Sequence, residues 1–287
     1  MAKKLSVHCV YGESNLPSLV SALIPSLEIA TTRDIDLFTI NYNPQSIQQL
    51  DSGNQGRVTI HNIVNPKDAN TGFAENHNIL FGVANPDPFF VIINPDCIAT
   101  EGCFDKLIET KVDSAGPIGI VESRQWPFDH PKEYDMDTFD TPWASGACAL
   151  IDSEFYRQIG GMAEEYFMYC EDVDLSWQAW INGYRVLYQP ESVVMHFSGG
   201  PFYDPGEVPA EVVYSLCNYI ALSRKFFGTE AESAAIARVR QENEELAAVV
   251  VNKYLAEVKP KLSSDYVGIH PPQVKIVGMN QYHELRA

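Results

Sequence analysis

The most informative stretch of the chain is FFVIINPD, residues 89–96. Its first five residues are apolar, which is too few for a buried helix but enough for a strand buried on both faces. Pro95 has no backbone N–H for a ladder in the middle of a sheet, so we expect the strand to end before it. Asp96 then lies at the carboxyl end of the strand. Open α/β sheets bind ligands at this edge, which predicts a ligand site beside Asp96.

On both sides of this strand, short apolar runs alternate with segments of helical period. The predicted strands cover residues 5–10, 35–40, 58–63, 118–122, 147–151, 184–189 and 192–197, and the predicted helices cover residues 17–27, 71–84, 104–110 and 172–182. A long loop rich in Pro, Asp and aromatic residues is expected at residues 125–141. This alternation predicts an α/β fold with a mainly parallel central sheet and helices on both faces.

The last third of the chain has a different pattern. Residues 209–227 and 230–258 have helical period, and the second segment carries an acidic face opposite an apolar stripe. We expect these helices either to pack on the sheet domain or to form a homodimer contact with a second copy of the chain. The predicted organisation is a sheet domain at residues 1–205 and a helical extension at residues 206–287, in which residues 266–287 have no predicted structure.

Composition excludes several classes of protein. The 287 residues are 45% hydrophobic and 20% charged, which excludes a mainly disordered chain. Acidic residues outnumber basic ones 38 to 20, and the net charge of −18 argues against nucleic acid as a partner. The sequence predicts no transmembrane segment, and its first ten residues lack the apolar stretch of a secretion signal. We expect a cytoplasmic protein, either free or at the inner face of a membrane.

Two polar clusters could bind a ligand. The first, NTGFAENHN at residues 70–78, leads into a predicted helix. It is either a helix cap or a set of amides that hold an anionic or hydroxyl-rich ligand. The second is NPD at residues 94–96, where the aspartate is either a turn residue or a ligand for Mg²⁺ or Mn²⁺.

A third cluster combines carboxylates with aromatic residues. The sequence EDVD, residues 171–174, begins a predicted helix, and His196 follows at the end of a later strand. Acidic residues are favoured in a first helical turn whatever their function. The cluster also follows the aromatic run YFMY, residues 166–169, and apolar surroundings raise the pKa of a carboxylate toward that of a general base.

Five motifs in a specific order point to a known family. They are NTGFAEN at 70–76, NPD at 94–96, GGM at 160–162, YFMYCEDVDL at 166–175 and HFSGG at 196–200. Over residues 5–200 this order resembles the family-2 glycosyltransferases, and among them the bacterial rhamnosyltransferase-like branch. The resemblance implies a GT-A fold and a nucleotide-sugar donor. It also implies inverting transfer to a hydroxyl acceptor, which is a glycan, a lipid-linked sugar or a small molecule, as in polysaccharide biosynthesis.

The resemblance implies roles for individual residues. Asp96 matches the last carboxylate of a metal-binding Asp-x-Asp motif, and His196 completes the site for a divalent cation, Mn²⁺ or Mg²⁺. Asp172 matches the general base, and Glu171 would orient the acceptor. The expected donor-binding residues are Tyr11, Asn41, Gly72, Asn76, Asn94 and Asp96. The expected acceptor wall is Trp143, Ser145 and Gly146, because an aromatic face stacks on a sugar ring, although a core or lid tryptophan would look the same in the sequence.

Departures from the family pattern leave a second interpretation open. Asn94 stands where the first carboxylate of Asp-x-Asp is expected, and Asn41 stands where an aspartate usually binds the base. Cys217 replaces a phosphate-binding arginine, for which Arg224 or Lys225 could compensate unless they lie on a solvated helix face. The alternative function is a non-catalytic GT-A-like domain that binds a nucleotide or glycan and acts in assembly. Gly-x-Gly-x-x-Gly and Gly-x-Ser-x-Gly motifs are missing, which argues against a nicotinamide enzyme and a hydrolase.

Overall fold

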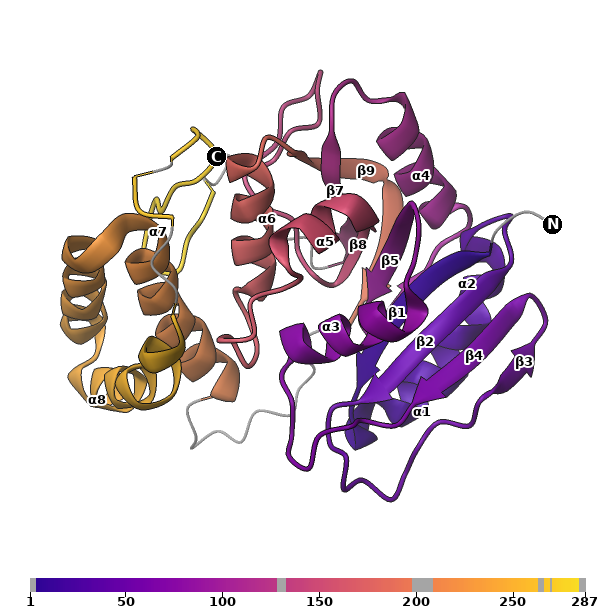
Figure 1. Ribbon diagram of the computed structural model, residues 1–287, viewed down its shortest axis with the longest axis horizontal. Helices are drawn as coiled ribbons and strands as arrows, with labels where there is room; N and C mark the ends of the chain where they lie inside the picture. The colour runs from indigo at the N-terminus through magenta and orange to yellow at the C-terminus, as the bar shows by residue number, and fades with distance from the viewer. Residues whose placement is uncertain (1–3, 128–132, 198–208, 263–265, 269, 284–287) are drawn as a thin grey trace.

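The computed structural model describes residues 4–127, 133–197, 209–262, 266–268 and 270–283. Within these residues a nine-stranded sheet lies between two layers of helices. The C-terminal helices lie to one side of the sheet, next to α6 (Glu171–Ile181), and are drawn in orange and yellow in Figure 1. The chain therefore has the α/β architecture that the sequence predicts, with a helical C-terminal region.

Most strands of the sheet point the same way. The order across the sheet is β3 (Gly53–Gln55), β4 (Val58–Ile63), β2 (Ile35–Asn41), β1 (Leu5–Tyr11), β5 (Phe89–Ile93), β8 (Cys148–Asp152), β7 (Ile118–Trp126), β9 (Arg185–His196) and β6 (Cys97–Ala99). The neighbouring pairs β4–β2, β2–β1, β1–β5 and β7–β9 are parallel, whereas β8 is antiparallel to both of its neighbours. The short strands β3 and β6 add antiparallel pairs at the two edges. The carboxyl ends of β1, β2, β5 and β9 consequently lie at one edge.

Helices cover both faces of the sheet. One face carries α1 (Leu16–Ser18), a π-helical turn (Leu19–Leu23), α2 (Ile24–Ala30) and α4 (Cys103–Asp113), and the other carries α3 (Phe73–Ala84), α5 (Ser153–Ile159) and α6. The strand β5 shows why two layers are needed. Val91 and Ile93 enter the core under α2 and α4, whereas Phe90 and Ile92 enter the core under α3 and α5. The strand is buried on both faces, as its unbroken apolar run predicts.

The predicted strands 184–189 and 192–197 are a single strand, β9, and the prediction of two was wrong. Against β7, Ser123 pairs with Gln189 but Arg124 pairs with Val193, so the extra residues around Pro190 form an irregularity in the ladder. A bulge lets a strand accommodate a proline without ending. Because the strand continues, its last residue, His196, reaches the carboxyl edge of the sheet.

The predicted break between the two C-terminal helices is confirmed. The element α7 (Ala210–Glu242) consists of two helices that meet at a kink at Gly228, whose φ is +88°. The second predicted helix, 230–258, was wrong in its extent, because it is interrupted at Asn243, whose side chain accepts a hydrogen bond from the N–H of Leu246 at 3.0 Å. This bond caps α8 (Glu244–Lys253), which continues through a π-helical turn (Tyr254–Val258) and a 3₁₀ turn (Lys259–Lys261).

The C-terminal extension shares a hydrophobic core with α6. Val173 and Trp177 of α6 pack against buried side chains of α7, of α8 and of the segment 274–282. Of the two options for these helices, packing on the sheet domain is therefore observed, whereas a homodimer stays a prediction. Among the described residues, no helix combines the length and the hydropathy needed to cross a bilayer.

A buried ion-pair cluster joins the extension to α6. Lys225 of α7 is only 3% exposed, and its Nζ lies 2.6 Å from Asp174 Oδ2 and 2.7 Å from Glu165 Oε1. Tyr166 donates a further hydrogen bond to Asp174 at 2.9 Å. Burial by itself would lower the pKa of Lys225, but the carboxylates of Asp174 and Glu165 raise it above its ordinary value. Lys225 is thus neither on a solvated helix face nor a lining residue of the ligand cavity described below.

Candidate active site

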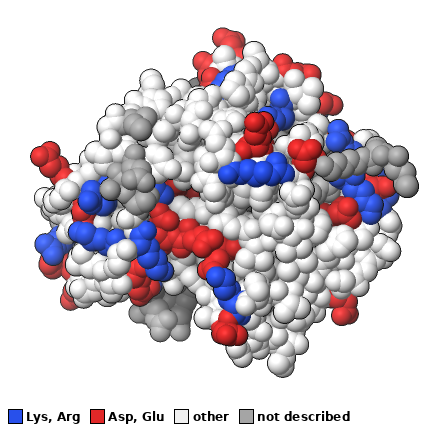
Figure 2. All heavy atoms as spheres, viewed as in Figure 1, with Lys and Arg blue, Asp and Glu red and all other residues white. Residues whose placement is uncertain are grey.

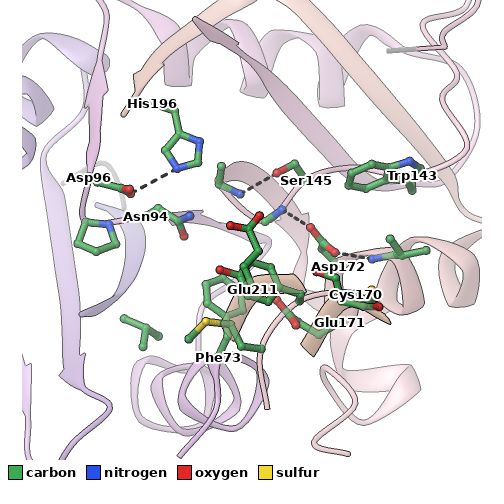
Figure 3. Close-up of a pocket in the computed structure, with 18 of the residues that line it drawn as sticks. Phe73, Asn94, Asp96, Trp143, Ser145, Cys170, Glu171, Asp172, His196 and Glu211 are labelled. Carbon is green, nitrogen blue, oxygen red and sulfur yellow. Dashed lines mark hydrogen bonds and ion pairs between the residues drawn. The ribbon is translucent and has the colours of Figure 1, made fainter. Parts of the chain in front are cut away.

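A cavity of about 650 Å³ lies at the carboxyl edge of the sheet. The ends of β1, β5 and β9 line it on one side, and the corner that precedes α6 lines it on the other (Figure 3). The start of α7 and the segment 280–283 complete the wall. Nine of the predicted site residues line this cavity: Tyr11, Asn94, Asp96, Trp143, Ser145, Gly146, Glu171, Asp172 and His196.

Asp96 and His196 meet at one end of the cavity. Cys97 of β6 pairs with His196 of β9, so Asp96, one residue before β6, lies beside the imidazole. His196 Nε2 is 3.4 Å from Asp96 Oδ1, and Nδ1 is 2.6 Å from Gln125 Oε1. Because the amide oxygen can only accept, Nδ1 carries a proton, and Nε2 is the ring nitrogen that faces Asp96. Nε2 and the carboxylate of Asp96 are suited to share a cation.

The donor set fits a divalent cation such as Mn²⁺ or Mg²⁺. Such ions commonly take one or two protein side chains and fill their remaining positions with substrate phosphates and water. Cys97 Sγ lies within 4.8 Å of the other two donor atoms. Burial raises the pKa of Cys97 well above its usual range, and its thiol donates a hydrogen bond to the carbonyl of Ala147 at 3.5 Å. Since the thiolate is the form that binds metals, Asp96 and His196 are the side chains here that are suited to bind a cation.

Asp172 lies at the opposite end of the cavity, in the first turn of α6. Its Oδ2 accepts a hydrogen bond from the N–H of Gly146 at 3.0 Å, and its Oδ1 accepts one from the N–H of Val173 at 2.8 Å (Figure 3). A Cβ on Gly146 would lie 3.3 Å from the ring of Phe73, so a glycine suits this close approach. The two bonds fix the plane of the carboxylate at the cavity wall.

Glu171 lines the cavity next to Asp172 and is almost completely buried. Its side chain is 5% exposed, and its Oε2 has no hydrogen-bond partner among the described residues. Burial and then the charge of Asp172 raise the pKa of Glu171 well above its ordinary value. The expectation that the aromatic surroundings of this cluster raise a carboxylate pKa is therefore confirmed for Glu171. Glu171 therefore holds its proton to a higher pH than an ordinary glutamate, and in the protonated form it can donate a hydrogen bond.

A strained corner presents these two acids to the cavity. Tyr169 and Cys170 have φ values of +70° and +67°, in the left-handed region that residues other than glycine rarely adopt. Asn218 of α7 donates hydrogen bonds to the carbonyls of Met168 and Tyr169 at 2.8 and 2.7 Å. The hydroxyl of Tyr282 lies 3.4 Å from Cys170 Sγ. Strain of this kind persists only where the surroundings hold it, and here the C-terminal extension does so.

The end of the cavity beyond Asp96 is walled by tyrosines. The ring of Tyr11 lines the cavity, while its hydroxyl lies 3.1 Å from Gln49 Oε1 and 3.1 Å from Asn62 Oδ1. Tyr42 packs directly on the backbone of Gly12, where a Cβ would lie 2.2 Å from the Tyr42 ring. These aromatic faces are suited to contact a flat group such as a nucleotide base.

Asn41 and Asn76, predicted for the donor pocket, lie outside the cavity lining, and this is a correction. The Oδ1 of Asn41 accepts from the N–H of Asn43 at 2.9 Å, and its amide donates to the carbonyl of Gln48 at 3.3 Å. Asn76 is 0% exposed and donates to the carbonyl of Gly72 at 2.8 Å. Both side chains satisfy the backbone of their own loops, which is the helix-cap and turn function that polar residues often have.

Gly72 also lies behind the cavity wall, and its predicted role in donor binding is corrected in the same way. A Cβ at Gly72 would lie 2.2 Å from the carbonyl oxygen of Phe167. The same carbonyl accepts a hydrogen bond from the N–H of Phe73 at 2.9 Å. Glycine is needed here because two segments of backbone touch, the start of α3 and the aromatic run before α6.

Around the predicted acceptor wall, the cavity lining contains residues that the sequence did not indicate. Trp143 donates from Nε1 to His283 Nδ1 at 2.8 Å, which joins the predicted wall to the end of the described chain. Glu211 of α7 also lines the cavity, and Figure 3 shows its carboxylate between the Asp96–His196 pair and Asp172. Other lining residues that we did not predict are Asn15, Tyr42, Phe73, Met168, Tyr169, Ser215, Asn280, Gln281 and Tyr282. No local pattern distinguishes them, although the positions of Tyr42 and Phe73 just after a strand and at a helix start could have suggested them.

Many lysine and arginine side chains outside the cavity form ion pairs. Figure 2 shows several of them next to acidic side chains on this face. A second hollow of about 300 Å³ contains Glu75, which pairs with Lys67 at 2.9 Å, and Glu257, which pairs with Lys253 at 2.6 Å. This hollow therefore lies between an ion pair at α3 and an ion pair within the extension. The residues 198–200 of the predicted HFSGG motif and 128–132 of the predicted long loop lie outside the described residues.

Comparison with curated proteins finds rhamnosyltransferases. N-acetylglucosaminyl-diphospho-decaprenol L-rhamnosyltransferase of Mycobacterium tuberculosis is 34% identical over 88 residues, which are 30% of this chain and 28% of that protein. Rhamnosyltransferase WbbL of Escherichia coli K12 is 24% identical over 161 residues, which are 44% of this chain and 61% of that protein. The matches thus span less than two thirds of the length of either relative. A comparison with known family profiles finds no match.

Comparison with solved structures shows the fold. The mannosyltransferase PcManGT of Pyrobaculum calidifontis, solved with GDP-Man and Mn²⁺, has a TM-score of 0.57 at 13% identity and covers 89% of this chain and 76% of its own. S. aureus TarS, residues 1–349, has a TM-score of 0.50 at 10% identity and covers 90% of this chain and 73% of its own. The chain has a GT-A fold. Together with the curated relatives, this confirms the resemblance to rhamnosyltransferase-like family-2 glycosyltransferases.

Proposed function

We propose that the protein is an inverting glycosyltransferase that moves a sugar, with rhamnose as the first candidate, from a nucleoside diphosphate to a hydroxyl acceptor. The observation that carries the proposal is the arrangement of one cavity with a cation site, Asp96 and His196, at one end and an oriented carboxylate, Asp172, at the other. The likeness to two rhamnosyltransferases supports an enzyme over the non-catalytic alternative and suggests the sugar.

The charge of the cavity supports assistance by a metal ion. Among its described lining residues there is no lysine or arginine, whereas Asp96, Glu171, Asp172 and Glu211 are acidic. A diphosphate that enters such a cavity needs a positive partner, because the acidic wall would otherwise repel it. A divalent cation held by Asp96 and His196 would supply that charge and stabilise the diphosphate as it leaves.

Asp172 can act as the general base. As the acceptor oxygen forms its bond to the anomeric carbon, its proton moves to a carboxylate oxygen of Asp172. The bond between the anomeric carbon and the diphosphate oxygen breaks in the same step, and its electron pair leaves with the nucleoside diphosphate. Attack from the side of Asp172, opposite the Asp96–His196 end, inverts the configuration of the anomeric carbon. The N–H groups of Gly146 and Val173 hold the base in place during this step.

Glu171 is suited to position the acceptor rather than to deprotonate it. A buried carboxylic acid that keeps its proton can donate a hydrogen bond to an acceptor oxygen, which orients another hydroxyl toward Asp172. The two adjacent acids would therefore have different roles because their surroundings differ, since Asp172 receives two backbone N–H groups and Glu171 lies in an apolar setting.

A donor screen tests the proposal. Release of nucleoside diphosphate is measured for a panel of nucleotide sugars that includes rhamnose donors, with Mn²⁺, with Mg²⁺ and with EDTA. We expect release from one donor class that requires the divalent ion. Calorimetry with the free nucleoside diphosphates provides the parallel binding measurement, in which the ion should strengthen binding. Neither release nor binding with any donor would contradict the proposal and favour the non-catalytic domain.

A further inference from the structure

The segment 280–283 is anchored against the catalytic corner. Tyr282 is 5% exposed, and its ring makes edge contacts with Trp143 and Trp177, with ring centroids 6.4 and 5.7 Å apart. Its hydroxyl donates to Asn280 Oδ1 at 2.8 Å and lies 3.4 Å from Cys170 Sγ. Tyr282 thus fixes this segment beside Glu171 and Asp172, although more than one hundred residues separate them in the sequence.

The same segment orients the aromatic part of the wall. His283 Nδ1 accepts the hydrogen bond from Trp143 Nε1 at 2.8 Å, and the two ring centroids are 5.6 Å apart. Trp143 therefore has its indole N–H satisfied and its ring held at the cavity wall, where an aromatic face can stack on a sugar ring. Asn280 and Gln281 line the cavity next to it, and amide side chains both donate and accept hydrogen bonds.

Two carboxylates line this part of the cavity. They belong to Asp172 and Glu211, and Figure 3 shows the Glu211 carboxylate between the Asp96–His196 pair and Asp172. None of the described residues of the lining is a lysine or an arginine. Glu171 in addition presents a buried oxygen, Oε2, that no described residue satisfies, which is the kind of group that a bound hydroxyl would complete.

We propose that Trp143 and the segment 280–283 form an acceptor subsite for an uncharged, hydroxyl-bearing sugar ring, and that Asp172 and Glu211 exclude a ring that carries a carboxylate or a phosphate. This inference rests on the proposed glycosyltransferase function and deepens it. An uncharged ring offers hydroxyl groups that donate to the carboxylates and amides, and an apolar face for Trp143. An anionic substituent would meet the carboxylates of Asp172 and Glu211 at close range.

Matched acceptors test the exclusion of charge. With the donor identified by the screen, transfer to p-nitrophenyl glucoside is compared with transfer to p-nitrophenyl glucuronide, which differs by a carboxylate at C6. The same comparison is made for N-acetylglucosamine and its 6-phosphate. We expect kcat/KM to be higher for the uncharged member of each pair by about tenfold or more, since a charge near these carboxylates meets repulsion of several kcal/mol before screening. Equal use of both members would overturn the proposal.

Variants of Glu211 test whether this side chain causes the discrimination between uncharged and anionic acceptors. Glu211→Gln should lower the ratio of kcat/KM for the uncharged acceptor over the anionic one, and Glu211→Lys should lower it further, by about tenfold in all. Glu211→Gln keeps the shape of the side chain, so the ratio can be read even if the larger change perturbs folding. A ratio that does not change in either variant would contradict the proposal.

Variants of the segment 280–283 test its contact with the acceptor. Gln281→Ala and His283→Ala should raise the KM for the acceptor by about threefold to tenfold, as expected for the loss of one hydrogen bond, and should change the KM for the donor much less. His283→Asn, which keeps an acceptor atom for Trp143 Nε1, should restore part of the loss. Gln273→Ala is the control, because Gln273 precedes this segment in the C-terminal extension and does not line the cavity.

The outcomes separate this inference from the proposed function. If no donor is turned over and no nucleoside diphosphate binds, the proposed function fails. If donor turnover is observed but the Gln281 and His283 variants change the acceptor and donor KM values equally, or not at all, only the acceptor subsite fails.

Discussion

The two ends of the cavity are built in different ways. At the cation end, Asp96 and His196 are adjacent because β6 and β9 pair, and Gln125 of β7 supports the imidazole from within the same sheet. At the acid end, Glu171 and Asp172 lie after a corner with left-handed residues, which is held by Asn218 and Tyr282 of the C-terminal extension. One end belongs to the sheet, whereas the other depends on contacts between segments far apart in the chain.

This difference suggests a division of function. At the edge of a sheet, backbone hydrogen bonds between the strands place the side chains. These bonds form whatever residues come after the strands. A corner held by another part of the chain can be changed by substitutions in that part alone. The cation end is therefore suited to a constant task, binding of the diphosphate, and the acid end is suited to a variable one, choice of the acceptor.

The largest effect is expected for Asp172→Asn. The amide keeps an oxygen for the N–H of Gly146 but cannot take a proton, so transfer should fall by about 10²- to 10⁴-fold. Affinity for the nucleoside diphosphate, measured by calorimetry, should stay near that of the wild type because the cation end is untouched. Asp113→Asn, at the exposed end of α4, is the matched control. Turnover of Asp172→Asn at the wild-type rate would show that Asp172 is not the base.

Lys225→Met should destabilise the acid end by removing one member of a buried ion-pair cluster. Asp174 is 0% exposed and would be left without its cation, which typically costs about 3–5 kcal/mol in the free energy of unfolding. Lys253→Met removes an ion pair with the exposed Glu257 and should cost less than about 1 kcal/mol. Urea denaturation of both variants measures the difference. Similar losses in the two would mean that the buried cluster does not hold the extension to α6.

Gln125→Leu tests the support of the cation end without changing Asp96 or His196. The variant removes the oxygen that accepts from His196 Nδ1, and loss of such a partner typically lowers metal affinity by about 10- to 100-fold. Titration with Mn²⁺ in the presence of nucleoside diphosphate measures the affinity. Gln241→Leu, on the exposed surface of α7, serves as control. If the affinity of Gln125→Leu equals that of the control, Gln125 does not set the tautomer of His196.

The smallest effect concerns the pH dependence of stability at Glu171. Burial, and then the charge of Asp172, raise the pKa of Glu171 in the folded protein, so the folded state holds this proton to a higher pH than the unfolded state. The free energy of unfolding of the wild type should therefore fall relative to that of Glu171→Gln as the pH rises above about 4.3, the ordinary pKa of glutamate. The slope is at most about 1.4 kcal/mol per pH unit, and it should vanish once Glu171 ionises in the folded protein. Denaturation curves across this pH range that run parallel for the two proteins would contradict the raised pKa.

The sequence predicts the cation end well because strand ends are local features. The apolar run before Pro95 and the strand that ends at His196 are visible in the chain, and parallel strands bring their carboxyl ends to the same edge. The same reasoning also placed Asn41 and Asn76 in the donor pocket, whereas in the structure they lie outside the cavity lining. A polar residue after a strand looks the same whether it faces a ligand or satisfies its own loop, and here both bond to the backbone.

The acid end is only partly predictable. The aromatic run before Glu171 indicates an apolar setting, and the structure bears this out, but the support for the corner comes from Asn218 and Tyr282. The contact between Cys170 and Tyr282 spans 112 positions, and no periodicity or motif in the segment 266–283 signals it. Local sequence patterns do not indicate long-range packing of single side chains of this kind.

The left-handed corner at Tyr169 and Cys170 is held by residues that come later in the chain. This affects the order in which the two ends of the cavity can form during synthesis. The ribosome delivers Asp96, Gln125 and His196 before any residue of α7, so the parts of the cation end are all present while the extension is still being made. Residues 169–172 leave the ribosome earlier than His196, but the amide of Asn218 lies 49 positions after Tyr169, and Tyr282 lies 112 positions after Cys170. A nascent chain would therefore complete the support of its acid end only after Tyr282 has been added, well after all parts of the cation end.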